Sequence, residues 1–246
     1  MLRLIRGAIW TLYGACALAV FGLLFVVAAV LVLAVPRLEW RRGLARLLAR
    51  VALGIFGVRV TTLGLDNLPE GSCVVVANHS SYLDGIVLEA ALPPRFSFVV
   101  KREAASMPVV GVVLKRIGSE FVDRHNEGGR HRDARRVMRH AEAGHSLVFF
   151  PEGTFDAQAG LKRFHIGAFV AATRGDMPVV PVVIRGARRA LPSGARIPRP
   201  GSITVEILAP LAARDADVSA ETLRDDARRR ILERLGEPDL TSANSR

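Results

Sequence analysis

The chain has 246 residues, of which 50% are hydrophobic, and a formal net charge of +11 at pH 7. This length fits one domain plus an appendage, and the hydrophobic fraction is high for a purely soluble protein. The positive charge indicates an anionic partner, whereas only 6% of the residues are aromatic, which weighs against nucleic acid. We therefore expect a lipid membrane as partner and no nucleic acid.

The first segment, from Gly7 to Pro36, contains no charged residue. About 30 residues at about 1.5 Å each give a helix longer than a bilayer core requires, and the segment exceeds the apolar region of a secretory signal peptide. Arginines are denser after the segment than before it, so the positive-inside rule places the following domain on the cytoplasmic face of the cell (inner) membrane. A single span and a re-entrant hairpin both fit the sequence.

The next segment, Leu38 to Phe56, has apolar residues at helical spacing, with Arg42, Arg46 and Arg50 on the opposite side. This pattern predicts a basic amphipathic helix suited to an anionic lipid surface. The alternative is a helix packed on its own domain with a solvated arginine face. We expect residues 1–56 to form membrane-anchoring helices.

Residues 57–236 alternate short apolar runs with segments of helical periodicity. This alternation predicts an α/β domain with a mixed, mostly parallel central sheet flanked by helices. Residues 237–246 lack an apolar period and are expected to form a flexible tail. The expected strands are Val58–Leu63, Cys73–Ala77, Phe96–Lys101, Glu120–Asp123, Leu147–Phe150, Val179–Ile184 and Ile203–Ile207, and the expected helices are Leu83–Leu92, Pro108–Ile117, Gly129–Ala143, Ile166–Arg174 and Ala220–Leu235.

A histidine and an aspartate flank the start of the helix expected after the second strand. On one continuous helix His79 and Asp84 would point about 140° apart, but a histidine in the loop and an acid in the first helical turn can meet. A carboxylate beside an imidazole fixes its tautomer and raises its basicity, so the pair predicts a general base. The alternative is that Asp84 only caps the helix and His79 is an ordinary loop residue.

A second apolar strand, Leu147 to Phe150, also ends in polar residues, namely Pro151, Glu152, Gly153 and Thr154. In open α/β sheets, ligands bind where the carboxyl ends of such strands meet. We therefore expect the two strand ends to form one site.

Four ordered blocks of this chain resemble the motifs of the glycerolipid acyltransferases, specifically the 1-acylglycerol-3-phosphate acyltransferases. The blocks are Asn78-His79 with Asp84, then 118–124, 150–154 and 179–183. The resemblance covers roughly residues 55–215 and implies that 57–236 is an acyltransferase domain. It implies transfer of a fatty acyl group from a thioester of coenzyme A or acyl carrier protein to 1-acylglycerol-3-phosphate. The product would be phosphatidic acid in phospholipid biosynthesis, and no other cofactor is expected.

The resemblance also implies roles for individual residues. His79, oriented by Asp84, would deprotonate the acceptor hydroxyl, and Arg124 would bind its phosphate bidentately. Glu152 would bind an acceptor hydroxyl or orient Arg124, and Gly153 would let the backbone approach substrate. The full set of expected substrate-binding residues is Asn78, Gly118, Arg124, Glu152, Gly153, Thr154, Lys162, Arg163 and Pro181.

The chain departs from the family pattern at two places. Phe155 stands where the family often has an arginine, which removes one expected phosphate contact, and Lys162 and Arg163 are candidates to replace it. Residues 165–167, His-Ile-Gly, differ from the more basic Lys-Lys-Gly of the family. Pro181 interrupts an apolar strand and predicts a sheet edge or a bulge, and the resemblance implies that it shapes the acyl-donor pocket.

Several alternatives are less well supported by the sequence. Ser80 and Ser81 adjoin the histidine, but neither lies in the Gly-x-Ser-x-Gly turn of a serine hydrolase. The histidines form no metal-binding motif, so no metal is expected. Within the enzyme class, the acceptor could be another lyso-lipid, such as a lysophospholipid or lyso-ornithine lipid. A lipid esterase and a non-enzymatic lipid-binding protein are the remaining alternatives.

Overall fold

A computed structural model describes residues 22–23, 26–27, 29–123, 127–195, 197–212 and 219–241, and only the backbone of 127–131. The segment expected to enter the membrane, Gly7 to Pro36, lies mostly outside these residues, so its role stays a prediction. In the ranges that are described, none of the helices combines the length and the apolar character that crossing a bilayer requires.

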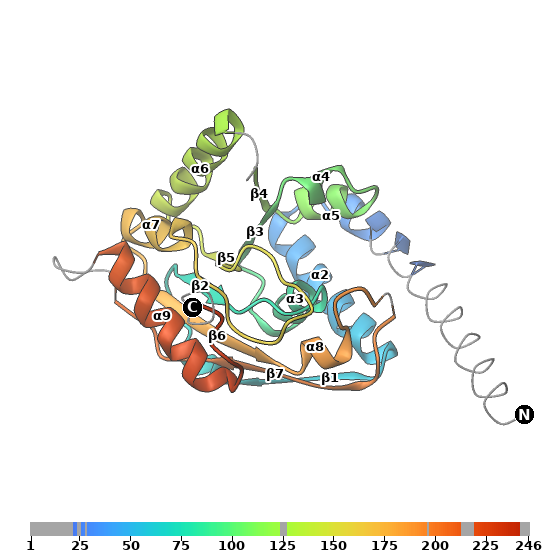
Figure 1. Ribbon diagram of the computed structural model, residues 1–246. Coiled ribbons are helices and arrows are strands. Elements are labelled where there is room, and N and C mark those ends of the chain that lie inside the picture. The colour runs from blue at the N-terminus through green and yellow to red at the C-terminus, as the bar shows by residue number, and fades with distance from the viewer. Residues whose placement is uncertain are drawn as a thin grey trace, which may run out of the picture.

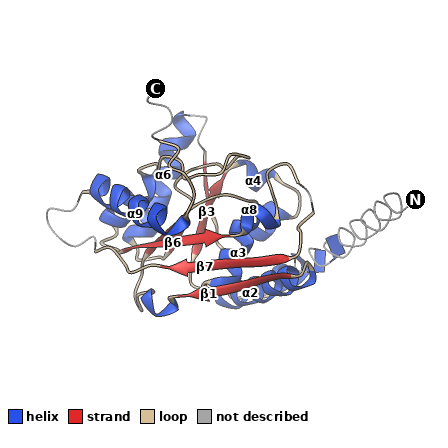
Figure 2. Cartoon of the chain, turned by 60° about the horizontal axis from the view of Figure 1, so that its bottom comes forward, coloured by secondary structure: helices blue, strands red, loops and turns tan. Residues whose placement is uncertain are grey.

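The domain is built on a seven-stranded sheet of order β1-β7-β6-β2-β5-β3-β4. Neighbouring strands are parallel except β6 and β7, and Figure 2 shows β7 and β1 pointing opposite to β6. This confirms the predicted mixed, mostly parallel sheet. The strands are β1 Val58–Leu63, β2 Val74–Ala77, β3 Ser97–Lys101, β4 Glu120–Val122, β5 Leu147–Phe149, β6 Val179–Arg185 and β7 Gly201–Ile207.

Helices cover both faces of the sheet (Figure 1). Because side chains alternate along a strand, Val75 and Ala77 of β2 join the core under α2, α3 and α8, whereas Val74 and Val76 join the core under α6, α7 and α9. All four residues are fully buried, as expected for a central strand covered on both sides. The helices are α2 Leu38–Ile55, α3 Leu83–Ala91, α4 Glu103–Ser106, α5 Val110–Arg116, α6 Glu127–Glu142, α7 Gly167–Arg174, α8 Ala187–Ala190 and α9 Ala220–Leu235, with a 3-10 turn at Leu65–Asn67.

Pro181 lies in β6, an interior strand between β7 and β2, so it does not mark a sheet edge. The predicted alternative, a bulge, fits the pairing, because Val182 pairs with Ile207 and Val179 with Leu211, which leaves one extra residue on the partner segment. Its carbonyl oxygen accepts a hydrogen bond from Leu208 N at 2.9 Å, just beyond the end of β7. The nitrogen and oxygen of one strand residue point to the same side, so the missing N–H of Pro181 also faces the end of β7. The β6–β7 ladder begins only at Val182, and the proline therefore sits where the sheet does not require its donor.

The arginines of α2 face the protein's own backbone. Arg42 donates to the carbonyl oxygens of Ile117 at 2.9 Å and Arg95 at 3.0 Å. Arg46 and Arg50 donate to carbonyl oxygens in the last turn of α3, whose carbonyls have no partner within their own helix. The helix thus packs on its own domain, as the second alternative predicted, but Arg42 and Arg46 are half-buried and bonded to backbone carbonyls, and Arg50 is the exposed one of the three. The reason is that long guanidinium side chains reach and cap the orphan carbonyls of the neighbouring helix.

The opposite face of α2 exposes apolar side chains. Trp40 is 60% exposed and Leu47 57%, and Val51 and Ile55 continue the same stripe. A contiguous apolar surface of this kind is typical of protein regions that contact a membrane or another protein. The apolar stripe of α2 thus lies at the surface, and the arginine side of the helix contacts the domain.

The predicted flexible tail, 237–246, begins with residues that pair with the domain. Leu161 N donates to Pro238 O at 2.9 Å, and Leu240 N donates to Leu161 O at 3.1 Å. Arg228 of α9 forms an ion pair with Asp239 at 2.5 Å and holds the pKa of that carboxyl below its usual range. The ordered domain thus continues to residue 241, and 242–246 lie outside the described residues.

Replacing Arg42 with Met keeps most of the aliphatic stem but removes the donors that bind Arg95, Ser97 and Ile117. We expect the free energy of unfolding to fall by about 2 kcal/mol, because partly buried oxygens lose a charged donor. Urea unfolding measures this change. Arg50→Met, which removes a single bond to Ala90 O, is the matched control and should cost less than about 1 kcal/mol. Equal losses in the two variants would contradict the role given to Arg42.

Candidate active site

The structure brings His79 and Asp84 together, with His79 Nδ1 2.9 Å from Asp84 Oδ2. The same carboxylate oxygen accepts the backbone N–H groups of Ser80 at 2.6 Å and Ser81 at 2.8 Å. Asp84 is fully buried, and its other oxygen, Oδ1, has no hydrogen-bond partner among the described residues. Three donors on one oxygen hold the loop between β2 and α3 in a fixed shape.

This contact determines how the imidazole is presented. A carboxylate only accepts, so Nδ1 carries the hydrogen and Nε2 is left as the basic nitrogen. The side chain of His79 is 18% exposed, so part of it is open to solvent. The predicted pairing is therefore present in the fold, and the part that the two residues play in turnover stays a prediction.

Aromatic rings enclose the imidazole. Phe150 stacks on His79 with ring centroids 4.4 Å apart, and Phe155 approaches it edge-on at 4.6 Å. Tyr82 in turn contacts Phe155 at 4.7 Å. From the sequence, Phe155 was expected only to remove a phosphate contact, whereas in the fold it forms a wall beside His79. The two phenylalanines that flank the motif 151–154, Phe150 and Phe155, were the sequence signal that could have revealed this enclosure.

Glu152 joins the two strand-end loops. Its Oε1 accepts the backbone N–H of His79 at 2.6 Å, and its Oε2 accepts that of Lys162 at 2.9 Å. The side chain is 5% exposed, and burial raises its pKa to about 7, although the two backbone donors act in the opposite direction. Glu152 was expected to bind an acceptor hydroxyl or to orient Arg124. The observed contacts instead hold the backbone of His79 in place.

Asn78 continues the sheet beyond the last residue of β2. Its Oδ1 accepts Ile184 N at 2.7 Å and its Nδ2 donates to Ile184 O at 3.0 Å, so the buried amide imitates a strand residue beside β6. Gly153 has a positive φ of 79°, which a glycine adopts without strain. Thr154, one residue further, is exposed.

The three cations predicted to bind substrate, Lys162, Arg163 and Arg124, differ in how their positions relate to His79. Lys162 lies close to the histidine loop through Glu152, but its ammonium forms an ion pair with Asp156. Arg163 is exposed and, after Arg224 and Arg228, helps to lower the pKa of Asp225 on α9, so it lies toward that helix. Arg124 lies outside the described residues.

Two other predicted residues serve the packing of the domain. Gly118 has a positive φ of 78°, and a Cβ there would lie 3.0 Å from Arg42 Nη2, so the glycine makes room for α2. Pro181 is buried in register with Val76 inside the sheet. A cation that the sequence analysis did not name, Lys101, stands at the carboxyl end of β3, in register with Val122.

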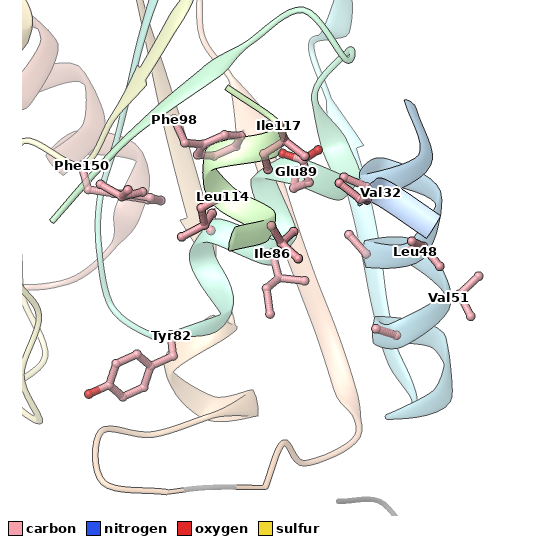
Figure 3. A pocket seen from close by; sticks show the side chains of 16 residues that line it. Val32, Leu48, Val51, Tyr82, Ile86, Glu89, Phe98, Leu114, Ile117 and Phe150 are labelled. Atoms are coloured by element: carbon pink, nitrogen blue, oxygen red, sulfur yellow. The ribbon is translucent and has the colours of Figure 1, made fainter. Parts of the chain in front are cut away.

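The domain contains an apolar pocket of about 290 Å³ (Figure 3). Phe150, which stacks on His79, and Tyr82 line one end of it. The walls come from α2, α3, β3 and α5 and reach Val32, and they are almost wholly hydrocarbon. This shape and chemistry suit an apolar chain. In the part of the chain that the structure describes, no three His, Cys, Asp or Glu side chains gather closely enough to hold a metal ion.

Comparisons with known proteins agree with the geometry. A family model described as Acyltransferase matches residues 59–185, a range that contains His79, Asp84 and Glu152. The chain is 31% identical over 202 residues to a chloroplastic 1-acyl-sn-glycerol-3-phosphate acyltransferase of Brassica napus, a match that covers 81% of this chain and 57% of that protein. It is 37% identical over 162 residues to a lysophospholipid acyltransferase of Mus musculus, covering 61% of this chain and 29% of that protein.

The chain thus spans little more than half the length of the first of these relatives and less than a third of the second. A solved structure, the 1-acyl-sn-glycerophosphate acyltransferase PlsC from Thermotoga maritima, superimposes with a TM-score of 0.75 at 22% identity. That match covers 99% of this chain and 98% of the other. At this level of identity the likeness supports the fold alone.

Replacing Glu152 with Gln should flatten the pH dependence of stability. The folded protein keeps the Glu152 proton up to about pH 7, while the unfolded chain releases it near the usual pKa of 4.5. The stability that comes from this group is therefore greatest at low pH and is lost as pH rises toward 7. We expect the fall in unfolding free energy between pH 5 and pH 8 to be smaller in Glu152→Gln by about 2 kcal/mol.

Urea unfolding at several pH values measures this difference. Glu142→Gln, at an exposed position on α6, is the control and should retain the full dependence of the parent protein. If Glu152→Gln also retains it, the buried carboxyl does not hold its proton.

Proposed function

We propose that this chain, which belongs to the acyltransferase family, moves a fatty acyl group from a thioester to the free hydroxyl of 1-acylglycerol-3-phosphate. The product is phosphatidic acid, a precursor in phospholipid biosynthesis. The observation that carries the proposal is the 2.9 Å contact between His79 Nδ1 and Asp84 Oδ2, next to Phe150, which lines an apolar pocket. The printed name of the Brassica napus relative, an enzyme acting on this acceptor, gives further support.

In the proposed reaction, His79 Nε2 takes the proton of the acceptor hydroxyl while the hydroxyl oxygen attacks the thioester carbonyl carbon. The tetrahedral intermediate then expels the thiolate, which recovers the proton from the imidazolium. Asp84 stabilises the positive charge that exists on His79 between these steps. General-base catalysis of this kind contributes about 10² to 10⁴ in rate, and no acyl-enzyme is required.

The apolar pocket would hold the acyl chain of the donor. Each methylene group removed from water contributes about 0.8 kcal/mol, and the pocket walls are hydrocarbon near Phe150. The acyl chain would thus lie with its thioester toward His79, since Phe150 and Tyr82 line the end of the pocket that is nearest to this histidine. Coenzyme A and acyl carrier protein are both compatible with this arrangement as the carrier.

The phosphate of the acceptor would be bound near the carboxyl ends of β3 and β4. Lys101 ends β3 in register with Val122, the last residue of β4, and Arg124 comes two residues after Val122 in the sequence. A guanidinium and an ammonium together suit a phosphate dianion. Lys162 is a weaker candidate because Asp156 already neutralises it.

The enzyme would work at the surface of a membrane. The helix α2 exposes a stripe formed by Trp40, Leu47, Val51 and Ile55, and the same helix lines the pocket. An acyl chain could then pass between lipid and pocket without crossing water. The cytoplasmic face of the cell membrane and the anchoring role of Gly7 to Pro36 are parts of this proposal that rest on the sequence.

A second candidate acceptor is another lysophospholipid. Phe155 replaces a cation of the family pattern with an aromatic wall beside His79, which lowers the positive charge offered to a phosphate monoester. The printed name of the Mus musculus relative, a lysophospholipid acyltransferase, fits this alternative.

Substitution of the catalytic pair tests the reaction. His79→Ala and Asp84→Asn should each lower kcat for acyl transfer to 1-acylglycerol-3-phosphate by about 10² to 10⁴, because the base or its orienting charge is lost. Transfer of radiolabelled acyl groups from acyl-coenzyme A measures the rate. Ser81→Ala is the control, since its hydroxyl is buried and bonded to Leu191 O. A much larger loss in Ser81→Ala than in His79→Ala would replace the general-base mechanism with a serine nucleophile.

Substitution at position 124 tests the acceptor. Arg124→Met should raise KM for 1-acylglycerol-3-phosphate about tenfold or more while leaving KM for the acyl donor unchanged, because a charged hydrogen bond to phosphate is lost. Steady-state kinetics with both substrates varied separate the two constants. The same variant assayed with a monoacylglycerol, which lacks the phosphate, is the control. A matching rise in KM for that acceptor would show that Arg124 does not bind phosphate.

A further inference from the structure

A carboxyl group interrupts the otherwise hydrocarbon wall of the pocket. Glu89, on α3, lines it together with valine, leucine, isoleucine, alanine and phenylalanine side chains. Figure 3 shows the oxygens of Glu89 among Ile117, Phe98 and Val32, at the end of the pocket away from Tyr82. Tyr82 and Phe150 mark the end next to His79. Glu89 stands at the end away from His79, which we call the inner end, where the tail of a bound acyl chain would lie.

The carboxyl of Glu89 has no hydrogen bond or ion pair with any described residue. Arg42 and Arg46 of α2 attract it electrostatically, yet their donors are engaged by backbone carbonyls and by Ser97. Burial raises the pKa of Glu89 to about 7, so near neutral pH the group is present both as an acceptor and as a donor. A polar group in an apolar cavity without a partner is unfavourable, and such groups in folded proteins usually have one.

We propose that Glu89 makes the inner end of the pocket selective for acyl chains that carry a hydroxyl group, over unsubstituted chains of the same length. This proposal rests on the proposed acyl-transfer function. A hydrocarbon tail that reaches Glu89 displaces water from the carboxyl group and forms no hydrogen bond to replace it. A hydroxyl on the tail replaces that water, because it both donates to and accepts from a carboxyl group.

A purely structural role for Glu89 predicts a different result. If the carboxyl only balanced the charges of Arg42 and Arg46, its removal would lower stability or affect all acyl chains equally. A role in selectivity changes the ratio between hydroxylated and unsubstituted chains instead. The ratio of kcat/KM values therefore separates the two.

The experiment compares acyl-coenzyme A donors of one length, unsubstituted or with a single hydroxyl placed at successive positions toward the tail, in transfer to 1-acylglycerol-3-phosphate. In the parent protein we expect kcat/KM to be about threefold or more higher for the hydroxylated donor whose hydroxyl reaches Glu89, which is the gain of one net hydrogen bond. Glu89→Met should abolish this preference, and Glu89→Gln, which keeps hydrogen-bonding atoms, should retain part of it.

Ile86→Met is the matched control, because it reshapes the same pocket from the same helix without changing its polarity. It should leave the hydroxyl preference intact. Equal ratios in the parent protein and in Glu89→Met would overturn the proposal while transfer itself proceeds. If no donor is transferred, the proposed function fails, and equilibrium binding of the corresponding hydroxylated and unsubstituted fatty acids to the parent and Glu89→Met then decides the selectivity by the same ratio.

Discussion

One carboxylate oxygen organises the site. Asp84 Oδ2 accepts hydrogen bonds from the backbone of Ser80 and Ser81 and from the imidazole of His79, and all of these lie in the short connection between β2 and α3. Because β2 is buried on both faces and Asn78 extends it against β6, the loop starts from a rigid point. The histidine is therefore held between a fixed strand end and a fixed helix start, with Nε2 as its free basic nitrogen.

A second carboxylate connects this loop to the rest of the sheet edge. Glu152 follows β5, the parallel neighbour of β2, and accepts the backbone N–H of His79. A hydrogen bond thus links the two loops, and the aromatic rings of Phe150 and Phe155 contact the imidazole. Asp84 and Glu152 are both buried next to a single histidine, and the backbone N–H groups that surround them take the place of water.

The pocket depends on α2, and α2 depends on its arginines. Guanidinium groups that cap α3 and bind the loop after α5 draw the charged face of the helix onto the domain, which leaves its apolar face outside. The same docking closes one wall of the apolar pocket. Docking of the arginine side and exposure of the apolar side are thus two results of one set of hydrogen bonds, and together they place the pocket beside a surface suited to lipid.

The sequence by itself determined the alternation of strands and helices, the mostly parallel sheet and the proximity of His79 and Asp84. These follow from local periodicity and from a strand-loop-helix connection too short to separate the two residues. Only the tertiary structure decided that Pro181 is interior, that the arginines of α2 face inward, that Phe155 walls the histidine and that Glu89 enters the pocket. Each of these depends on contacts between segments that are far apart in the sequence, such as the contact of Pro181 with the end of β7 or of the α2 arginines with the last carbonyls of α3. A periodic pattern separates the two sides of a helix or strand but carries no information about what each side meets.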